Sequence, residues 1–98
     1  MRVNISGLAE ADIEAIADFI AEDNPMRAGS FARELWDACV GLGDAPFRFA
    51  QLEDYENRGY RRRVYGRYSI IYRVDGDEVL VVRVFSSLLD IRAVLGEN

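Results

Sequence analysis

Apolar residues in the first half of the chain recur every three or four positions, which is the spacing of amphipathic helices. The first such stretch follows Ser6, a suitable N-cap, and ends near Asp23. Acids in its first turns suit the positive end of a helix dipole. One face of this predicted helix gathers the residues expected to be buried: Ala9, Ile13, Ile16, Ala17 and Ile20.

A second apolar stretch predicts a second helix. Asn24 is a suitable cap, and Pro25 takes the first helical position, where its missing N–H is harmless. Gly41 and Gly43 mark the end of the helix. Because the turn between the two helices is short, they are predicted to pack antiparallel as a hairpin. The expected buried face of the second helix is Ala28, Phe31, Leu35, Ala38, Cys39 and Leu42.

The second half of the chain changes to the β-branched and aromatic composition of strands. After a connector at residues 44–57, strands are predicted at residues 59–65, 67–74 and 78–85. Gly66 marks the first turn, and the sequence "DGD" after the second strand marks a hairpin.

The remaining segments complete the predicted fold. Residues 2–6 read as a short strand with Val3 and Ile5 on one face, and residues 89–95 fit either a final short helix or an edge segment. The last long strand is the most apolar and is expected at the centre of the sheet. The order β-α-α-β-β-β predicts one α+β domain over residues 1–98, with the helix hairpin packed on one face of an antiparallel sheet.

Composition fits this picture of one folded domain. The chain has 98 residues, half of them hydrophobic, with eight Gly and two Pro. One cysteine, Cys39, permits no internal disulfide and is expected to be a small core residue. No apolar run is long enough to span a membrane and the N-terminus does not resemble a signal peptide, so a cytoplasmic protein is expected.

Charge is segregated along the chain, whose net charge is −5. Residues 1–54 carry 4 Arg and 11 acids, whereas residues 55–98 carry 8 Arg and 6 acids. Between residues 57 and 74 there are 6 Arg and no acids. An acidic chain binds nucleic acid poorly without a specific site, but the local positive patch suits an acidic partner.

Candidate chemistry is sparse. The chain has no His and one Cys, which removes the common nucleophile–base pairs and the His- or Cys-based metal sites. The "DGDE" of residues 75–78 lacks the ligand spacing of a calcium loop and is better explained as a hairpin turn. No catalytic residue, metal ligand or cofactor is therefore predicted.

The arginines of the two hairpin strands remain to be explained. Arg61 and Arg63 share a face with Tyr65, and Arg62 lies on the opposite face. In the next strand Tyr68, Ile70, Tyr72 and Val74 are expected to meet the helices, while the face with Arg67, Ser69, Ile71 and Arg73 looks outward or towards an edge. Two interpretations stay open: the arginines pair with the acidic helices, or they form a partner-binding surface.

The frame "L…A..DI..I..FIAEDNP..A..F…L" followed by "GYRRRVYGRYSIIYRVDGDEVLVVRV", from about Leu8 to Val84, resembles ParE toxins of the RelE/ParE superfamily. The resemblance implies a RelE/ParE-like fold and the toxin half of a bacterial type II toxin–antitoxin pair. It implies neutralisation by a ParD-like antitoxin, which is a ribbon-helix-helix protein. The toxin would contact DNA only through this antitoxin. It also implies a non-enzymatic toxin that binds and inhibits DNA gyrase.

The RelE cousins on the same fold cleave messenger RNA, and this alternative stays open. In the RelE pattern the strand position of Ser69 holds a catalytic Arg, yet this chain has Ser there, no Lys, and no Tyr after Tyr72. An RNase would need Arg61, Arg63, Arg67 or Arg83 to replace the missing groups. The missing residues favour gyrase inhibition.

The chain also departs from ParE after Val84, where "FSSLLDI" keeps only Asp90 and Ile91 of the usual segment. Because the family's C-terminal segment is implicated in toxicity, a degenerate toxin that only binds its antitoxin is a third hypothesis. The apolar residues Phe85, Leu88 and Leu89 are expected either to pack on the sheet or to dock against a partner.

The resemblance favours a partner-binding role for the arginine hairpin, with the acidic antitoxin tail as its first candidate partner and gyrase as its second. A groove between the helix hairpin and the sheet is expected to take the antitoxin's apolar side chains. The predicted partner-binding residues are Phe19, Phe31, Trp36, Arg61, Arg63, Arg67, Arg73 and Arg83.

Overall fold

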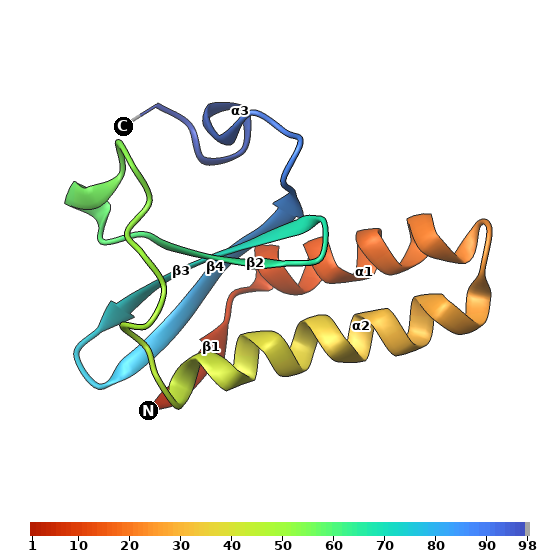
Figure 1. The fold of residues 1–98 in the computed structure, drawn as a ribbon, viewed down its shortest axis with the longest axis horizontal. Coiled ribbons are helices and arrows are strands. Elements are labelled where there is room, and N and C mark those ends of the chain that lie inside the picture. The colour runs from red at the N-terminus through yellow and green to blue at the C-terminus, as the bar shows by residue number, and fades with distance from the viewer. Residues whose placement is uncertain (98) are drawn as a thin grey trace.

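A four-stranded sheet with two long helices on one face makes up most of the computed structural model, which describes residues 1–97 (Figure 1). The elements are β1 (Arg2–Ile5), α1 (Gly7–Ala21), α2 (Pro25–Val40), β2 (Arg61–Tyr65), β3 (Tyr68–Asp75), β4 (Glu78–Ser86) and α3 (Ile91–Leu95). Short 3-10 turns occupy residues 41–43 and 56–58. The predicted element order and the α+β class are confirmed.

The strand order is β1-β4-β3-β2, so the apolar strand β4 is internal, as predicted. One detail of the predicted sheet is wrong. β1 runs parallel to β4, pairing Val3 with Val79 and Ile5 with Val81, whereas β2, β3 and β4 are antiparallel. A parallel pair requires a long connection, and here it consists of the helix hairpin, which crosses one face of the sheet, followed by β2 and β3.

Both long helices begin at the predicted caps. Ser6 Oγ accepts a hydrogen bond from the Ala9 N–H at 3.1 Å, and Asn24 Oδ1 accepts one from the Arg27 N–H at 3.1 Å. Ser6 also donates its hydroxyl proton to the carbonyl of Val82 at 2.9 Å, which ties the start of α1 to the central strand. α1 ends at Ala21, just before the expected end near Asp23.

The main core lies between the helix hairpin and the sheet. All six residues of the predicted α2 stripe are buried, whereas in α1 only Ala9 and Ile13 are fully buried. Strand β3 points the expected residues at the helices: Ile70 and Tyr72 are buried in this core, and Tyr68 and Val74 pack against it. Within residues 1–97, no helix is both long enough and apolar enough to cross a membrane.

The opposite face of the sheet is covered as well, which corrects the expectation that the Arg67–Ser69–Ile71–Arg73 face looks outward. The chain after β4 turns back over this face, and α3 lies on it (Figure 1). A second apolar cluster fills the space: Leu52, Tyr55, Tyr60, Ile71 and Phe85, flanked by Val82, Ile91, Val94 and Leu95. Of these four residues, Ser69 and Ile71 are buried, whereas Arg67, in the turn before β3, and Arg73, near the end of β3, reach solvent.

Side chains of the 51–60 region hold the C-terminal segment in place. The Tyr55 hydroxyl donates to the carbonyl of Gly96, and Arg58 donates to the carbonyls of Leu95 and Glu97 at 3.3 and 3.1 Å. Of the two forms expected for residues 89–95, the structure shows the short helix. Phe85 packs on the sheet, whereas Leu88 remains 92% exposed.

A β-bulge in β4 changes the face of the sheet to which the following side chains of that strand point. Ile71 faces Arg83 while the next residue, Tyr72, faces Val81, so Val82 is an extra residue. Both Val81 and Val84 therefore reach the main core, and Arg83 is directed at α1.

Candidate functional site

Arg83, one of the predicted partner-binding residues, is engaged inside the protein. Its Nε and one terminal nitrogen donate to the two carboxylate oxygens of Asp12 at 2.8 and 2.9 Å, and the Val84 N–H donates to the same carboxylate at 2.9 Å. This forked hydrogen bonding raises the pKa of Arg83 further. For Arg83 the structure therefore supports the internal-pairing interpretation of the arginines.

The other predicted residues lie in different parts of the molecule. Arg73 pairs with Asp75 at 2.9 Å beside the β3–β4 turn, and Arg67 is exposed at the β2–β3 turn. Phe31 is a core residue, 9% exposed, whose ring lies 5.9 Å from that of Tyr65 and 5.6 Å from that of Tyr68.

The three apolar residues expected to form one groove are not brought together. Phe19 is 68% exposed on α1 and Trp36 is 41% exposed on α2, while Phe31 lies in the core between helices and sheet. The expected groove of Phe19, Phe31 and Trp36 does not form as one site, because Phe31 belongs to the buried stripe of α2.

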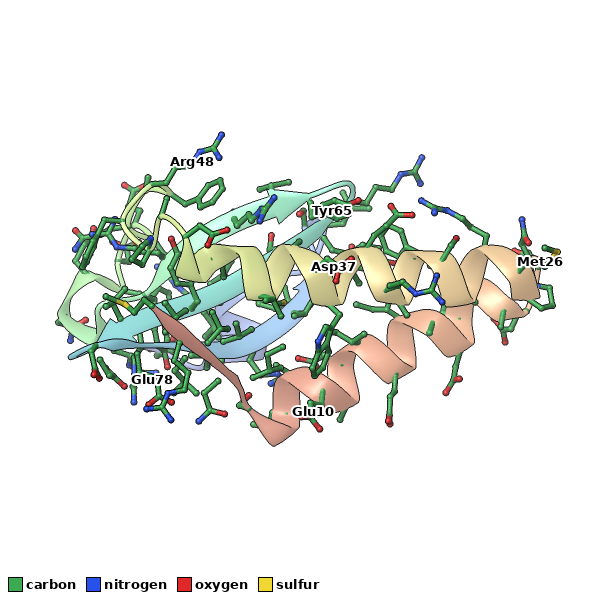
Figure 2. The ribbon with its side chains drawn as sticks, turned by 90° about the horizontal axis from the view of Figure 1, so that it is seen from below. Glu10, Met26, Asp37, Arg48, Tyr65 and Glu78 are labelled. Carbon is green, nitrogen blue, oxygen red and sulfur yellow. The ribbon has the colours of Figure 1, made fainter. Side chains whose placement is uncertain are left out.

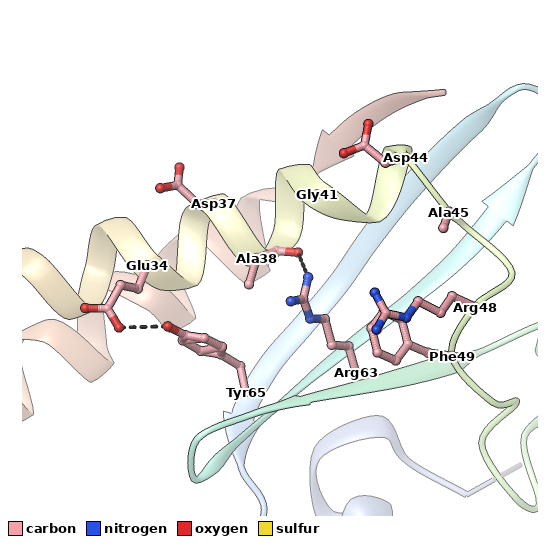
Figure 3. A pocket seen from close by; sticks show the side chains of 10 residues that line it. All are labelled: Glu34, Asp37, Ala38, Gly41, Asp44, Ala45, Arg48, Phe49, Arg63 and Tyr65. Carbon is pink, nitrogen blue, oxygen red and sulfur yellow. Dashed lines mark hydrogen bonds between the residues drawn. The ribbon is translucent and has the colours of Figure 1, made fainter.

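Arg63 lies on the helix side of β2, at a cleft between α2 and the residue 44–49 connector (Figure 3), and Arg61 lies next to this cleft on the same side of β2. Arg63 donates to the carbonyl of Ala38 at 2.8 Å, which satisfies a carbonyl in the last turn of α2. Arg61 donates to the carbonyl of Phe49 at 2.7 Å. The cleft holds about 450 Å³ and is lined by Glu34, Asp37, Ala38, Gly41, Asp44, Ala45, Arg48, Phe49, Arg63 and Tyr65.

Aromatic rings lie against the guanidinium groups of this cleft and of the neighbouring Arg61. Arg48 and Arg63 both lie over the ring of Phe49, at 5.3 and 5.2 Å from its centre, and Arg61 lies 5.2 Å from the centre of the Phe47 ring. Contact with a ring restricts a guanidinium and leaves its N–H donors, which lie in the guanidinium plane, available to other acceptors. We call Arg48, Arg61 and Arg63 with their two rings the Arg–Phe cluster.

Carboxylates surround the cleft but do not neutralise the cluster. Among residues 1–97 the ion pairs are Arg27–Glu34, Arg73–Asp75 and Arg83–Asp12, and none of them involves Arg48, Arg61 or Arg63. Glu34 accepts instead from Arg27 and from the Tyr65 hydroxyl at 2.7 Å, and these hydrogen bonds lower the pKa of Glu34. Asp37 and Asp44 point away from Arg63 in Figure 3.

Sequence reasoning missed the connector's share of this cleft. Arg48, Phe47 and Phe49 lie outside the arginine-rich strands, and the concentration of aromatic residues in the connector is the one sequence signal that could have found them. Figure 2 shows Arg48 and Tyr65 on the side where β2 and α2 meet, with Met26 at the far tip of the helix hairpin.

A separate, apolar groove runs between α1 and the C-terminal segment. It holds about 540 Å³, with Phe19 and Ile16 on the α1 side and Leu88 and Leu89 on the other. Arg67 lies at its edge. Phe19, Leu88 and Leu89 are all more than half exposed, so the groove is open to a partner.

Neither concavity contains the parts of a familiar catalytic centre. Burial raises the pKa of the Cys39 thiol to about 12, so it is a neutral core side chain. No group of three or more His, Cys, Asp or Glu side chains within residues 1–97 is placed to hold a metal ion. Ser69 is 1% exposed, and its hydroxyl shares a 2.9 Å hydrogen bond with that of Ser87.

Comparison with known proteins gives a family match. The family model described as "ParE toxin of type II toxin-antitoxin system, parDE" matches residues 3–88. No curated protein matches the chain significantly.

Two solved structures are similar to this chain. A chain of the chromosomal ParDE TA system from P. aeruginosa has a TM-score of 0.74 and 22% sequence identity, over 88% of this chain and 95% of that chain. A chain of the toxin–antitoxin complex RelBE2 from Mycobacterium tuberculosis has a TM-score of 0.65 and 22% identity, over 87% of this chain and 95% of that chain. At this identity the two structures show the shared fold.

Proposed function

The chain belongs to the ParE toxin family of type II toxin–antitoxin systems, and on this basis we propose that it blocks replication by binding DNA gyrase until a ParD-like antitoxin sequesters it. The observation that carries the proposal is the family match, which covers residues 3–88 of the 98-residue chain. Such a target would place the protein's action in the cytoplasm.

The geometry supports binding rather than catalysis. The strand position where the RelE pattern has a catalytic Arg holds Ser69, whose side chain lies under the C-terminal segment with Ile71 and Phe85 as buried neighbours on the same face. An RNA could contact that face only if the segment moved away. Arg83 is one of the four arginines that an RNase would need in place of the missing groups, and it is engaged by Asp12.

The apolar groove is the site that best fits the antitoxin. Long-lived protein complexes bury more apolar surface than transient ones. Phe19 and Leu88 offer such surface on the two sides of one concavity, and Arg67 offers a charge at its edge. An amphipathic segment of the antitoxin would lay its apolar face here, with a carboxylate towards Arg67.

RNA cleavage is the second candidate function, because the fold is also similar to a chain of the RelBE2 complex. Pulse-labelling of DNA and protein synthesis after induction of this gene alone separates the candidates. Gyrase inhibition predicts that DNA synthesis stops first, with protein synthesis declining later. Protein synthesis stopping first, together with cut messenger RNA, would instead support the nuclease, and unimpaired growth would support a degenerate toxin that only binds its antitoxin.

A further inference from the structure

We propose that the Arg–Phe cluster is a second docking surface, distinct from the apolar groove, and that it binds a carboxylate-bearing segment of the toxin's target protein. The inference rests on the proposed function, because it names the surface that a ParE-type toxin of this sequence presents to its target.

The first observation is an uncompensated charge. Arg48 and Arg63 lie close to the same Phe49 ring, and no carboxylate within residues 1–97 forms an ion pair with either. Two guanidinium groups held near one ring repel each other, and an anion bound between them removes that repulsion. The carboxylates of Asp37 on α2 and of Asp44 in the connector do not fill this role, because both point away from Arg63 (Figure 3) and neither forms an ion pair within the described part of the chain.

The second observation is that the donors are held in place. Arg61 and Arg63 are each fixed by one hydrogen bond to a backbone carbonyl and by stacking on a ring. A guanidinium has five N–H donors, so both keep donors for a further acceptor. Fixed arginines lose little conformational entropy when they bind a carboxylate, and forked pairing makes the contact specific.

The third observation identifies the partner as a protein. Phe47 is 62% exposed beside Arg61, and exposed aromatic rings next to arginine are typical of protein interface hot spots. A nucleic acid suits the cleft less well, because its phosphates would run past Asp37 and Asp44 on a chain of net charge −5. A short acidic segment with one apolar side chain fits both the charge and the ring.

The occupant is assigned to the target rather than the antitoxin because the two concavities differ in character. The groove beside α1 is apolar and suits a long-lived complex, whereas the Arg–Phe cluster is charged and half-exposed, as in transient encounters. No residue lines both concavities, and the helices and strands that line one do not line the other.

Arg48→Glu is the sharpest test of the inference. Within residues 1–97 the Arg48 side chain makes no hydrogen bond, and its guanidinium contacts only the ring of Phe49. Arg63 is unsuitable, because it also holds the last turn of α2. The matched control is Arg33→Glu, an equal change of charge at an exposed position of α2 outside the cleft. Affinity for purified DNA gyrase and for the antitoxin is measured by calorimetry, alongside the arrest of DNA synthesis in cells.

The expected result is at least a tenfold loss of gyrase affinity and loss of the arrest for Arg48→Glu. Arg33→Glu should stay within about twofold of wild type, and both variants should keep the wild-type antitoxin affinity and unfolding midpoint. If Arg48→Glu binds gyrase as the wild type does, the inference is wrong while the proposed function stands. A loss of antitoxin affinity in this variant, or binding of single-stranded RNA that depends on Arg48, would also overturn the inference. Failure of the wild-type protein to bind gyrase would overturn the proposed function, and the inference with it.

Discussion

Asp12 is the residue on which the placement of α1 against the sheet depends most directly. Its carboxylate accepts three hydrogen bonds from β4, two from the Arg83 guanidinium and one from the Val84 N–H. The Asp12 and Arg83 side chains are 16% and 26% exposed, so neither can easily exchange its partner for water. The pair joins the middle of α1 to the bulge in β4.

Replacing Asp12 with Ala is therefore expected to lower the free energy of unfolding by about 2–4 kcal/mol, because it leaves a half-buried guanidinium and a backbone N–H without an acceptor. The matched control is Arg73→Ala, which breaks the exposed pair with Asp75 and should cost less than about 1 kcal/mol. Urea denaturation monitored by tryptophan fluorescence measures both. Equal, small losses would show that the Asp12 contact is as dispensable as a surface ion pair.

At the level of elements, the helices were predictable and the sheet was predictable only in part. Caps and apolar stripes act within a few residues, so Ser6, Asn24 and the α2 stripe could be identified from the sequence. The bulge, the parallel pairing of β1 and the contact between Asp12 and Arg83, 71 positions apart, depend on which distant segments meet. No local pattern encodes these contacts.

The candidate site shows the same division. Alternation placed Arg61 and Arg63 on one face of β2, and the structure confirms that they share the helix side with Tyr65. It could not show that the connector brings Arg48 and two phenylalanine rings to them. The helical period placed Phe31 in the buried stripe of α2 and left Phe19 outside the stripe of α1, as the structure has them, so grouping both rings in one partner groove went against that pattern.

The groove between α1 and the C-terminal segment gives a prediction about these two elements. Phe19→Ala or Leu88→Ala should weaken antitoxin binding by about 1–3 kcal/mol, because each removes an exposed apolar contact at the centre of the proposed interface. Neither should change the free energy of unfolding by more than about 0.5 kcal/mol, since both side chains already face solvent.

Met26→Ala is the control for this experiment, because Met26 is 88% exposed but lies at the tip of the helix hairpin, outside the groove. Titration calorimetry with the purified antitoxin compares the three variants. If both groove variants bind the antitoxin with wild-type affinity, the antitoxin binds another surface. If Met26→Ala loses as much affinity as the groove variants, the apolar contribution is not specific to the groove.

On the scale of the whole molecule, the fold compensates the charge separation along the chain only in part. Of the 12 arginines, Arg27, Arg73 and Arg83 pair with carboxylates, and the unpaired Arg–Phe cluster lies beside the acidic residues of α2. The arginine-rich stretch of the sequence therefore does not become a continuous basic surface. The Arg–Phe cluster is a small cationic site on a molecule of net charge −5.

This distribution predicts that the protein alone does not bind duplex DNA, and that it reaches an operator only through its antitoxin. Fluorescence anisotropy with a labelled 30-base-pair duplex at physiological salt should give a dissociation constant weaker than about 10⁻⁴ M, the weak end of non-specific binding. The same duplex carrying the operator should be bound when the antitoxin is added. Micromolar binding by the isolated chain, falling steeply with salt, would mean that the Arg–Phe cluster and Arg67 act together as a phosphate-binding surface despite the acidic α2 rim.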